Sequence, residues 1–246
     1  MSRRGRFLVF AVGAAGLMAL FVGALGGLPE FGGGFHPYRD RAVAAAWSRA
    51  TTNAVSSVNF EQRALDTLGE EMILLGSVLA AAVLLRPADD EGEREPPADG
   101  RLLPTTVLAG YLLLPVTLVL SLSVVAHGAI SPGGGFQGGV LAAGGLHLLY
   151  LAGSYRMLRR LRPDRWAVWA EAAGAGGFVA FGLAGLASAA TFLAGLLPTG
   201  EPGRLASAGT VLVLNLAVGV AVFGGVVELL ARFLRQEETL VGRGGR

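Results

Sequence analysis

The chain of 246 residues consists of long apolar stretches separated by short polar ones. A helix needs about 20 mostly apolar residues to cross a bilayer, so each stretch near that length is a candidate span. We expect six such helices, at residues 7–28, 67–85, 102–126, 138–155, 166–197 and 205–234. The pattern therefore predicts an all-α integral membrane protein with about six transmembrane helices.

The first two spans each require a choice of boundary. Residues 7–28 exceed the usual apolar core of a signal peptide, and no clear A-x-A cleavage site follows them, which favours a retained anchor helix. The second apolar run, residues 72–85, is too short to cross a membrane alone. Extending it back to Thr67 gives the required length but brings Glu70 and Glu71 into the helix.

The distribution of arginine predicts which side of the membrane each loop faces, because cytoplasmic loops carry an excess of basic residues. If the N-terminus is inside, the cytoplasmic segments hold 15 of the 20 arginines and the outer segments hold five. The densest group lies between residues 156 and 165. Both termini are therefore expected on the cytoplasmic side.

The polar segment 86–101 is acidic and contains prolines, a composition typical of linkers. It divides the chain into a two-helix module (1–88), a linker (89–101), a four-helix module (102–236) and a cytoplasmic tail (237–246). The longest connection is the outer loop 29–66. Its alanine-rich part, 42–58, is a candidate for a short helix lying at the membrane surface.

Composition excludes several classes of protein. Charged residues make up 15% of the chain and the mean hydropathy is +0.56, whereas soluble domains carry about 25% charged residues. A soluble enzyme is therefore excluded. The lack of cysteine rules out disulfides, iron–sulfur clusters and thiolate zinc sites, and we expect no cofactor, no metal site, no enzymatic activity and no nucleic-acid partner. Because the chain has no lysine, it holds no lysine-based proton relay.

The most distinctive motif is a glycine-rich run between the third and fourth expected spans. Nucleotide-binding glycine loops follow a β-strand, so a nucleotide site does not fit here. Two interpretations remain open: a tight outer turn in which Pro132 begins the next helix, or a docking surface or cavity lining in which Phe136 and Gln137 make the specific contacts. The run consists of Ser131, Pro132, Gly133, Gly134, Gly135, Phe136, Gln137, Gly138 and Gly139.

Together with His127-Gly128-Ala129-Ile130 before it, this run resembles the signature of the B subunit of Mrp-type multisubunit Na+/H+ antiporters. The resemblance continues at residues 170–174 (AEAAG) and 214–220 (LNLAVGV), and it covers about residues 102–234. It implies that His127, Asn215 and the glycine-rich run form a subunit-packing motif.

The front half carries a second resemblance, at residues 28–32 (LPEFG), 52–55 (TNAV) and 63–70 (RALDTLGE). These segments resemble the extreme C-terminal domain of the large A subunit of the same antiporters, which stands alone as the E subunit of related membrane-bound hydrogenases. A chain that joins the two modules suggests that they are neighbours in the assembled complex. The residues of the 63–70 segment that match the family's motif are Arg63, Asp66, Thr67 and Gly69.

The 63–70 segment also has structural interpretations. Thr67 and Glu70 have the spacing of a capping box, which would begin the second span, and Arg63 beside Asp66 suggests an ion pair. The functional alternative is that Glu70 or Glu71 faces a hydrated path along an interface.

Ionisable residues inside membrane spans are costly and usually face protein or water. Glu70, His147 and Glu171 are therefore the candidates for an ion or proton path. The structural alternatives are a hydrogen bond from His147 across a helix interface lined by small residues, and an ion pair between Glu171 and Arg165.

Three further polar positions favour structural roles. Glu228 precedes Arg232 by four residues, the spacing of a favourable ion pair on a helix. His127 is expected to cap or dock at the outer end of the third span, and Asn215 to make a polar contact between packed helices.

The resemblance implies an accessory subunit of a multisubunit monovalent cation (Na+)/proton antiporter in the cell membrane, which scaffolds or lines part of the path of Na+ and H+. Its expected partners are the lipid bilayer and subunits resembling A, C and D. Two alternatives remain. One is the equivalent subunit of a membrane-bound hydrogenase or complex I-like ion-pumping respiratory complex, and the other is a freestanding small transporter.

The arginine distribution makes the topology testable, since the chain has no cysteine of its own. The substitutions Asp90→Cys and Asp164→Cys should give residues shielded from a membrane-impermeant thiol reagent in intact cells, whereas Ser131→Cys should react. Reaction at position 164 from outside the cell would contradict the six-span topology.

Overall fold

The computed structural model describes residues 3–28, 32–86, 103–152 and 166–243, with side chains up to residue 233. This described part of the chain is helical with connecting loops and contains no strand, which confirms the predicted all-α class. One short element, η1, is a π-helix. The elements are α1 (Arg3–Gly26), α2 (Pro37–Ser48), α3 (Ala54–Ser57), η1 (Val58–Gln62), α4 (Ala64–Leu84), α5 (Pro104–Ala126), α6 (Gly135–Ala152), α8 (Trp166–Ala189) and α9 (Thr210–Arg243).

Five helices in the described ranges are long and apolar enough to cross a membrane: α1, α4, α5, α8 and the Thr210–Phe233 part of α9. The fourth expected span corresponds to α6, which has 18 residues and carries the polar Gln137 and His147. It packs between α5 and α9. Each expected span therefore has a helix, and five of them meet the requirements of length and hydropathy on their own.

The chain divides into two compact units, Met1–Asp40 and Arg41–Arg246. The first contains α1, in which no residue is buried. In the second, α4 packs against α8 and α9. The second span of the predicted front module thus belongs to the same compact unit as the predicted four-helix module. The module boundaries at residues 88 and 102 stay a prediction, because the linker lies outside the described residues.

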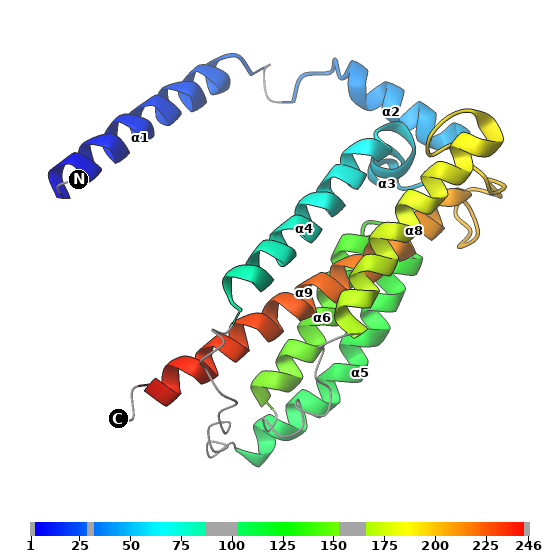
Figure 1. The fold of residues 1–246 in the computed structure, drawn as a ribbon. Helices are drawn as coiled ribbons and strands as arrows, with labels where there is room; N and C mark the ends of the chain where they lie inside the picture. The colour runs from blue at the N-terminus through cyan, green and yellow to red at the C-terminus, as the bar shows by residue number, and fades with distance from the viewer. Residues whose placement is uncertain (1–2, 29–31, 87–102, 153–165, 244–246) are drawn as a thin grey trace. The chain divides into compact units, whose positions relative to one another are not determined.

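The central helix of the second unit is α9. It packs against α4, α5, α6 and α8, and Figure 1 shows these helices gathered around it. Over an apolar window of 18 residues, 61% of the residues of α9 are buried, compared with 28% in α8 and 11% in α5. The core that surrounds it includes Phe178, Val211, Leu214, Val218 and Val222.

Small residues allow α8 and α9 to approach closely. Gly174 of α8 lies so near the Ala217 carbonyl and the Ala221 amide of α9 that a Cβ does not fit. Gly224 of α9 in turn faces α8, where an added Cβ would lie 2.5 Å from the Ala167 carbonyl oxygen. Membrane helices associate through such small-residue contacts because apolar burial alone gives no preference for protein over lipid.

The last two spans have different boundaries from those expected. α8 ends at Ala189 rather than at residue 197, because the chain folds back on it. The Leu193 N–H donates to the Gly182 carbonyl at 3.3 Å, and the Phe192 ring packs on the same glycine. α9 begins at Thr210 rather than at residue 205, and the Thr210 hydroxyl accepts a hydrogen bond of 2.9 Å from the backbone of the preceding loop.

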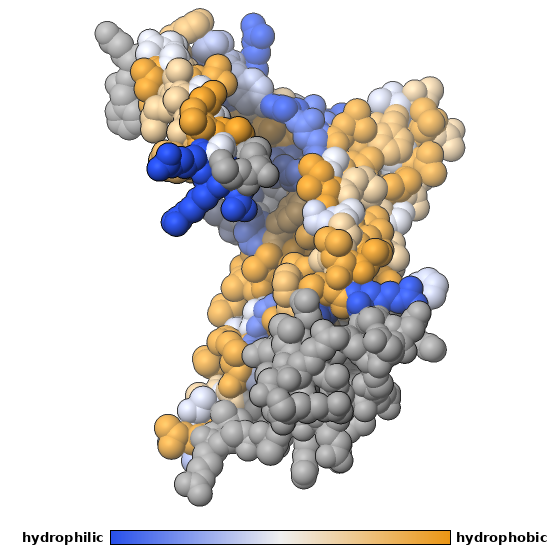
Figure 2. Space-filling model, turned by 60° about the vertical axis from the view of Figure 1, so that its left-hand side comes forward, coloured by the Kyte–Doolittle hydropathy of each residue, from blue (hydrophilic) through white to orange (hydrophobic). Residues whose placement is uncertain are grey.

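Large apolar side chains remain exposed along the spans. Leu112, Val119 and Leu122 of α5 and Ile73 and Val83 of α4 are all more than half exposed. In the view of Figure 2, hydrophobic residues cover much of the described surface. Apolar surface on this scale faces lipid or other protein chains, as expected for a membrane protein.

The close contact of α8 with α9 is tested by a matched pair of substitutions. Gly174→Ala should lower the thermal stability of the purified chain in detergent, because overpacking a filled interface costs about 1–3 kcal/mol. Gly176→Ala is the control, since nothing lies within 4 Å of a Cβ at that position. Circular dichroism melting measures both, and equal melting temperatures would contradict the packing described here.

Candidate functional site

The turn between α5 and α6 holds most of the motif residues. His127 is the C-cap of α5, as expected, and its Nδ1 lies 2.8 Å from a carbonyl oxygen one turn back. Gly133 and Gly134 have φ angles of 144° and 133°, values that glycine adopts without strain. α6 begins at Gly135. The expectation that Pro132 begins the helix is therefore wrong, and this proline lies within the turn.

Asn215 of α9 caps the start of α6 from a different helix. Its Oδ1 accepts a hydrogen bond of 2.9 Å from the Gly135 N–H, while its Nδ2 donates to the Val211 carbonyl at 3.0 Å and to the Ser56 hydroxyl at 3.3 Å. The side chain is fully buried. The first N–H groups of a helix have no hydrogen-bond partner within it. Asn215 therefore supplies the acceptor for the Gly135 N–H. The predicted polar contact between packed helices is confirmed.

The glycines of the run face two neighbouring helices. A Cβ on Gly139 would lie 2.8 Å from a backbone carbonyl oxygen of α9, and Gly138 faces α5, whose Ser121 hydroxyl donates to the Gly138 carbonyl at 2.7 Å. Phe136 packs against the core around α9, whereas Gln137 is exposed. Of the two side chains expected to make specific contacts, only Gln137 faces outward.

Thr52 and Asn53, from the front half of the chain, bind this same turn. The Asn53 Nδ2 donates to the carbonyls of Gly128 and Ser131, both at 2.8 Å. The backbone N–H of Asn53 donates to the Ala129 carbonyl, and the Thr52 hydroxyl donates to the Ile130 carbonyl, both at 3.1 Å. The two segments that carry separate resemblances are therefore joined by four hydrogen bonds.

Asn53 also begins α3. Its Oδ1 accepts hydrogen bonds from the backbone N–H groups of Val55 (3.2 Å) and Ser56 (3.4 Å), which is the usual role of asparagine at an N-cap. The expected helix at residues 42–58 is instead divided between α2 and α3, with Ala50 between them at a φ of 57°. Sequence analysis placed Asn53 in a motif but did not assign it this double role.

The 63–70 segment forms the start of α4. The predicted ion pair between Arg63 and Asp66 is present at the surface. The helix begins at Ala64, however, and Thr67 lies within its first turn, where its hydroxyl donates to the Asn59 carbonyl of η1 at 2.7 Å. The predicted capping box is therefore wrong. The Thr67 hydroxyl instead connects the π-helix to α4.

The buried carboxyl of α4 is Glu71 and not Glu70. Glu70 and Gly69 are exposed, whereas Glu71 is 1% exposed. Two further carboxyls are buried in the same unit, Glu171 of α8 at 2% and Glu228 of α9 at 4% exposed. Ionisable groups inside membrane spans are costly, so each of these buried carboxyls is a candidate functional residue.

These carboxyls differ in their partners. The Glu228 Oε1 accepts hydrogen bonds from Arg232, at 2.8 Å from Nη2 and 3.3 Å from Nε, which confirms the predicted pair. Within the described residues, the Oε1 atoms of Glu71 and Glu171 are buried without a hydrogen-bond partner. The ion pair expected with Arg165 lies outside these residues. No three acidic or histidine side chains in the described ranges are grouped to hold a metal ion.

His147 lies one turn after Ala143 on α6, and Ala143 packs in a buried cluster with Ala167 and Val227. The predicted hydrogen bond across the interface is not made by Nε2, which is buried and has no partner in the part of the chain that the structure describes.

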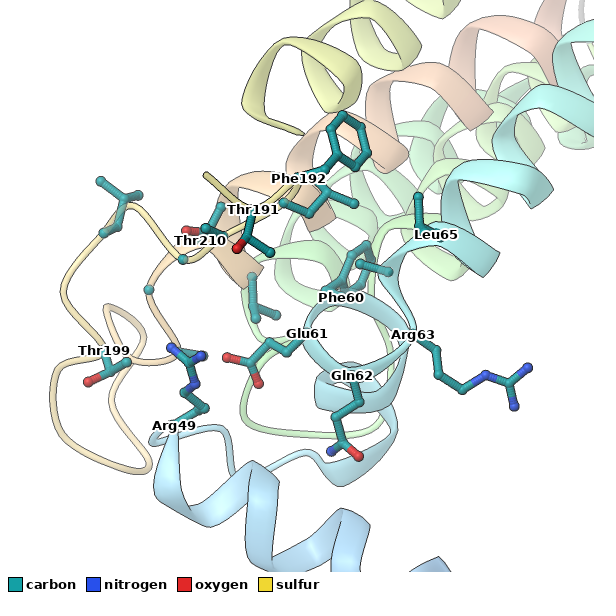
Figure 3. A pocket seen from close by; sticks show the side chains of 18 residues that line it. Arg49, Phe60, Glu61, Gln62, Arg63, Leu65, Thr191, Phe192, Thr199 and Thr210 are labelled. Atoms are coloured by element: carbon teal, nitrogen blue, oxygen red, sulfur yellow. The ribbon is translucent and has the colours of Figure 1, made fainter. Parts of the chain in front are cut away.

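A cavity of about 290 Å³ lies beside η1, and sequence analysis did not predict it. Figure 3 shows the Glu61 carboxylate and the Arg49 guanidinium pointing into it, while Arg63 points away. Glu61 accepts hydrogen bonds from the hydroxyls of Ser57 (2.7 Å) and Thr51 (3.1 Å). Burial raises the pKa of Glu61, although these hydrogen bonds and the charge of Arg49 partly offset that effect.

Comparison with known families identifies the part of the chain that contains the capped turn. Residues 105–228, about half of the chain, match a domain described as related to the MnhB subunit of Na+/H+ antiporter. The chain belongs to this MnhB-related family. The match confirms the resemblance of residues 102–234, and it includes Asn215, Glu171 and Glu228 but not Asn53 or Glu71.

Two solved structures share the fold of nearly the whole chain. One is the membrane-bound sulfane sulfur reductase, an archaeal respiratory membrane complex, in which a chain is 25% identical with a TM-score of 0.73, over 93% of this chain and 98% of that one. The other is the Mrp complex from Dietzia sp. DQ12-45-1b, at 28% identity and a TM-score of 0.71, over 94% of this chain and 26% of that chain. The protein thus spans about a quarter of the Mrp chain. A comparison with curated proteins gives no match.

The cap on α6 makes a prediction for stability. Asn215→Ala should destabilise the chain by roughly 1–3 kcal/mol, because the Gly135 N–H is left buried without an acceptor. Ser56→Ala is the matched control: it removes only the 3.3 Å bond to the same side chain and should cost less than about 1 kcal/mol. Thermal unfolding in detergent measures both. Equal losses would show that Asn215 contributes through Ser56 and not through α6.

Proposed function

We propose that this protein is an accessory subunit of a multisubunit monovalent cation (Na+)/proton antiporter in the cell membrane. The observation that carries the proposal is the MnhB-related match over residues 105–228, whose motif turn is built into the helix packing by Asn215. The likeness to the Mrp complex supports it further. The role is that of a transporter subunit without enzymatic activity.

The front half is proposed to correspond to the C-terminal domain of the antiporter A subunit. Two observations support this. The likeness to the Mrp chain extends over 94% of this chain and so includes most of the front half, and the Thr52-Asn53 segment is bonded directly to the MnhB-related turn. The part of the front half from Arg41 onward makes these polar contacts and lies in the same compact unit as the MnhB-related region.

The accessory role is proposed from the family match, because residues 105–228 are related to one subunit, MnhB, of an Na+/H+ antiporter. The proposed partners are subunits resembling A, C and D. The exposed apolar faces of α4 and α5 are available for such contacts.

A second candidate function is the equivalent subunit of an ion-pumping respiratory complex. The likeness to a chain of the archaeal sulfane sulfur reductase favours it, because that chain and this one match over almost their full lengths. The two functions differ in the partners that the protein should have.

Purification of the tagged chain from its native membranes in mild detergent distinguishes these functions. We expect subunits resembling A, C and D to be recovered with it. In everted membrane vesicles, addition of Na+ should dissipate the proton gradient. This response to Na+ should be lost when the gene is deleted and restored by the wild-type gene. Recovery with cysteine-rich electron-transfer subunits would identify the respiratory complex instead, and transport by the chain alone in liposomes would indicate a freestanding transporter.

A further inference from the structure

Three carboxyls lie in the seam where α4 meets α8 and α9. Glu71, Glu171 and Glu228 come one from each of these helices, and each is less than 5% exposed. The three helices pack against one another. Since α4 precedes the MnhB-related region and α8 and α9 belong to it, the seam joins the two halves of the chain.

Glycines of α9 fix the position of Glu171. A Cβ on Gly225 would lie 2.7 Å from the Glu171 Oε1 and 3.3 Å from the Val78 side chain of α4. The carboxyl of α8 therefore rests directly on a glycine of α9, at a level where α4 is also in contact. Glu228 follows Gly225 by three residues, so both lie on the same face of α9.

The spacing along α4 places Glu71 further along the same seam. It precedes Val78 by seven residues, which is two helical turns or about 10 Å, and so lies on the same face of α4. The three carboxyls are therefore arranged one after another along the helices: Glu71, then Glu171, then Glu228.

The three carboxyls differ in whether a basic residue is paired with them. Glu228 is paired with Arg232, while the Oε1 atoms of Glu71 and Glu171 are buried with no partner among the described residues. On the two helices packed against α8, the charged residues with described side chains are Asp66, Glu70 and Glu71 of α4 and Glu228 and Arg232 of α9. His147 lies on α6, which packs against α9.

Protons fit this arrangement better than sodium ions. Hard cations require several oxygen ligands, whereas the Glu171 Oε1 has no hydrogen-bond partner among the described residues, and a Cβ on Gly225 would contact both this oxygen and the apolar Val78 side chain. A proton needs only one carboxyl oxygen. Holding a proton also removes a buried negative charge, which is unfavourable without a partner.

We propose that Glu71, Glu171 and Glu228 form a proton-carrying series along the seam of α4, α8 and α9. Each step transfers one proton from a protonated carboxyl to the next carboxylate, directly after side-chain rotation or through water, so the total charge of the series is conserved. Glu228, which is paired with Arg232, is one end of the series. This inference rests on the proposed antiporter function and names the site within it.

Dicyclohexylcarbodiimide tests the proposal directly, because it adds to protonated carboxyls in apolar surroundings and leaves carboxylates unmodified. The complex that contains the full chain is treated in native membranes, digested and analysed by mass spectrometry. We expect modification of Glu71 and Glu171 and at least tenfold less of Glu228. The substitution Arg232→Ala should increase modification of Glu228. Modification of neither Glu71 nor Glu171, or of Glu70 alone, would overturn the proposal.

Transport by the assembled complex supplies the second measurement. Glu71→Gln and Glu171→Gln should each lower proton-coupled transport at least tenfold at unchanged complex yield, and Glu171→Asp should retain part of it because a proton-carrying carboxyl is kept. The control is Glu201→Gln, an exposed residue paired with Arg204 in a loop, which should transport as wild type. Normal transport by both glutamine variants would overturn the series while leaving the antiporter assignment intact. If the wild-type complex itself shows no Na+/H+ exchange, the proposed function is refuted.

Discussion

The structure depends on how one tight turn satisfies its buried backbone groups. Residues 127–135 reverse the chain between α5 and α6, and a turn of this kind presents N–H and carbonyl groups that cannot remain unpaired inside protein or lipid. Asn215 accepts from the first N–H of α6, and Asn53 donates to two carbonyls of the turn. Two asparagines from opposite halves of the chain, together with the Thr52 hydroxyl, therefore supply hydrogen bonds to the turn.

The glycines around this turn leave the space that the Asn215 amide needs to form its hydrogen bond. Gly128 and Gly134 lie so close to the Asn215 amide that a Cβ on either would come within 2.9 Å of its Oδ1. Only a backbone without side chains allows the amide to reach the start of α6. The glycine-rich run, for which the sequence left open a tight turn or a docking surface, gives a closely packed and specifically bonded interior.

Much of the fold was predictable because membrane spans are specified by long apolar stretches. The pairs Glu228–Arg232 and Arg63–Asp66 were predictable too, since each is local in sequence. The burial of Glu71 rather than Glu70 was not. A uniformly apolar helix gives no periodic signal for its inward face, and the π-helix and break before Ala64 prevent the orientation of α4 from being extrapolated from upstream residues. The end of α8 was also missed, because residues 190–197 are apolar in a loop that packs back onto the helix.

The turn and the buried carboxyls are mechanically connected. From Asn53 the chain passes through α3 and η1 into α4, and the Thr67 hydroxyl bonds η1 to the first turn of that helix. Glu71 follows Thr67 by one turn, so its height in the seam is set by where Asn53 is anchored. Glu171 is positioned from the other side, by the glycines of α9, the helix that also carries Asn215. The distance between the two unpaired carboxyls is therefore set by the hydrogen bonds of a turn that touches neither of them. In the proposed proton series, the glycine-rich motif would therefore contribute without any ionisable group in its glycine run, by fixing the relative positions of α4 and α9, which carry Glu71 and Glu228.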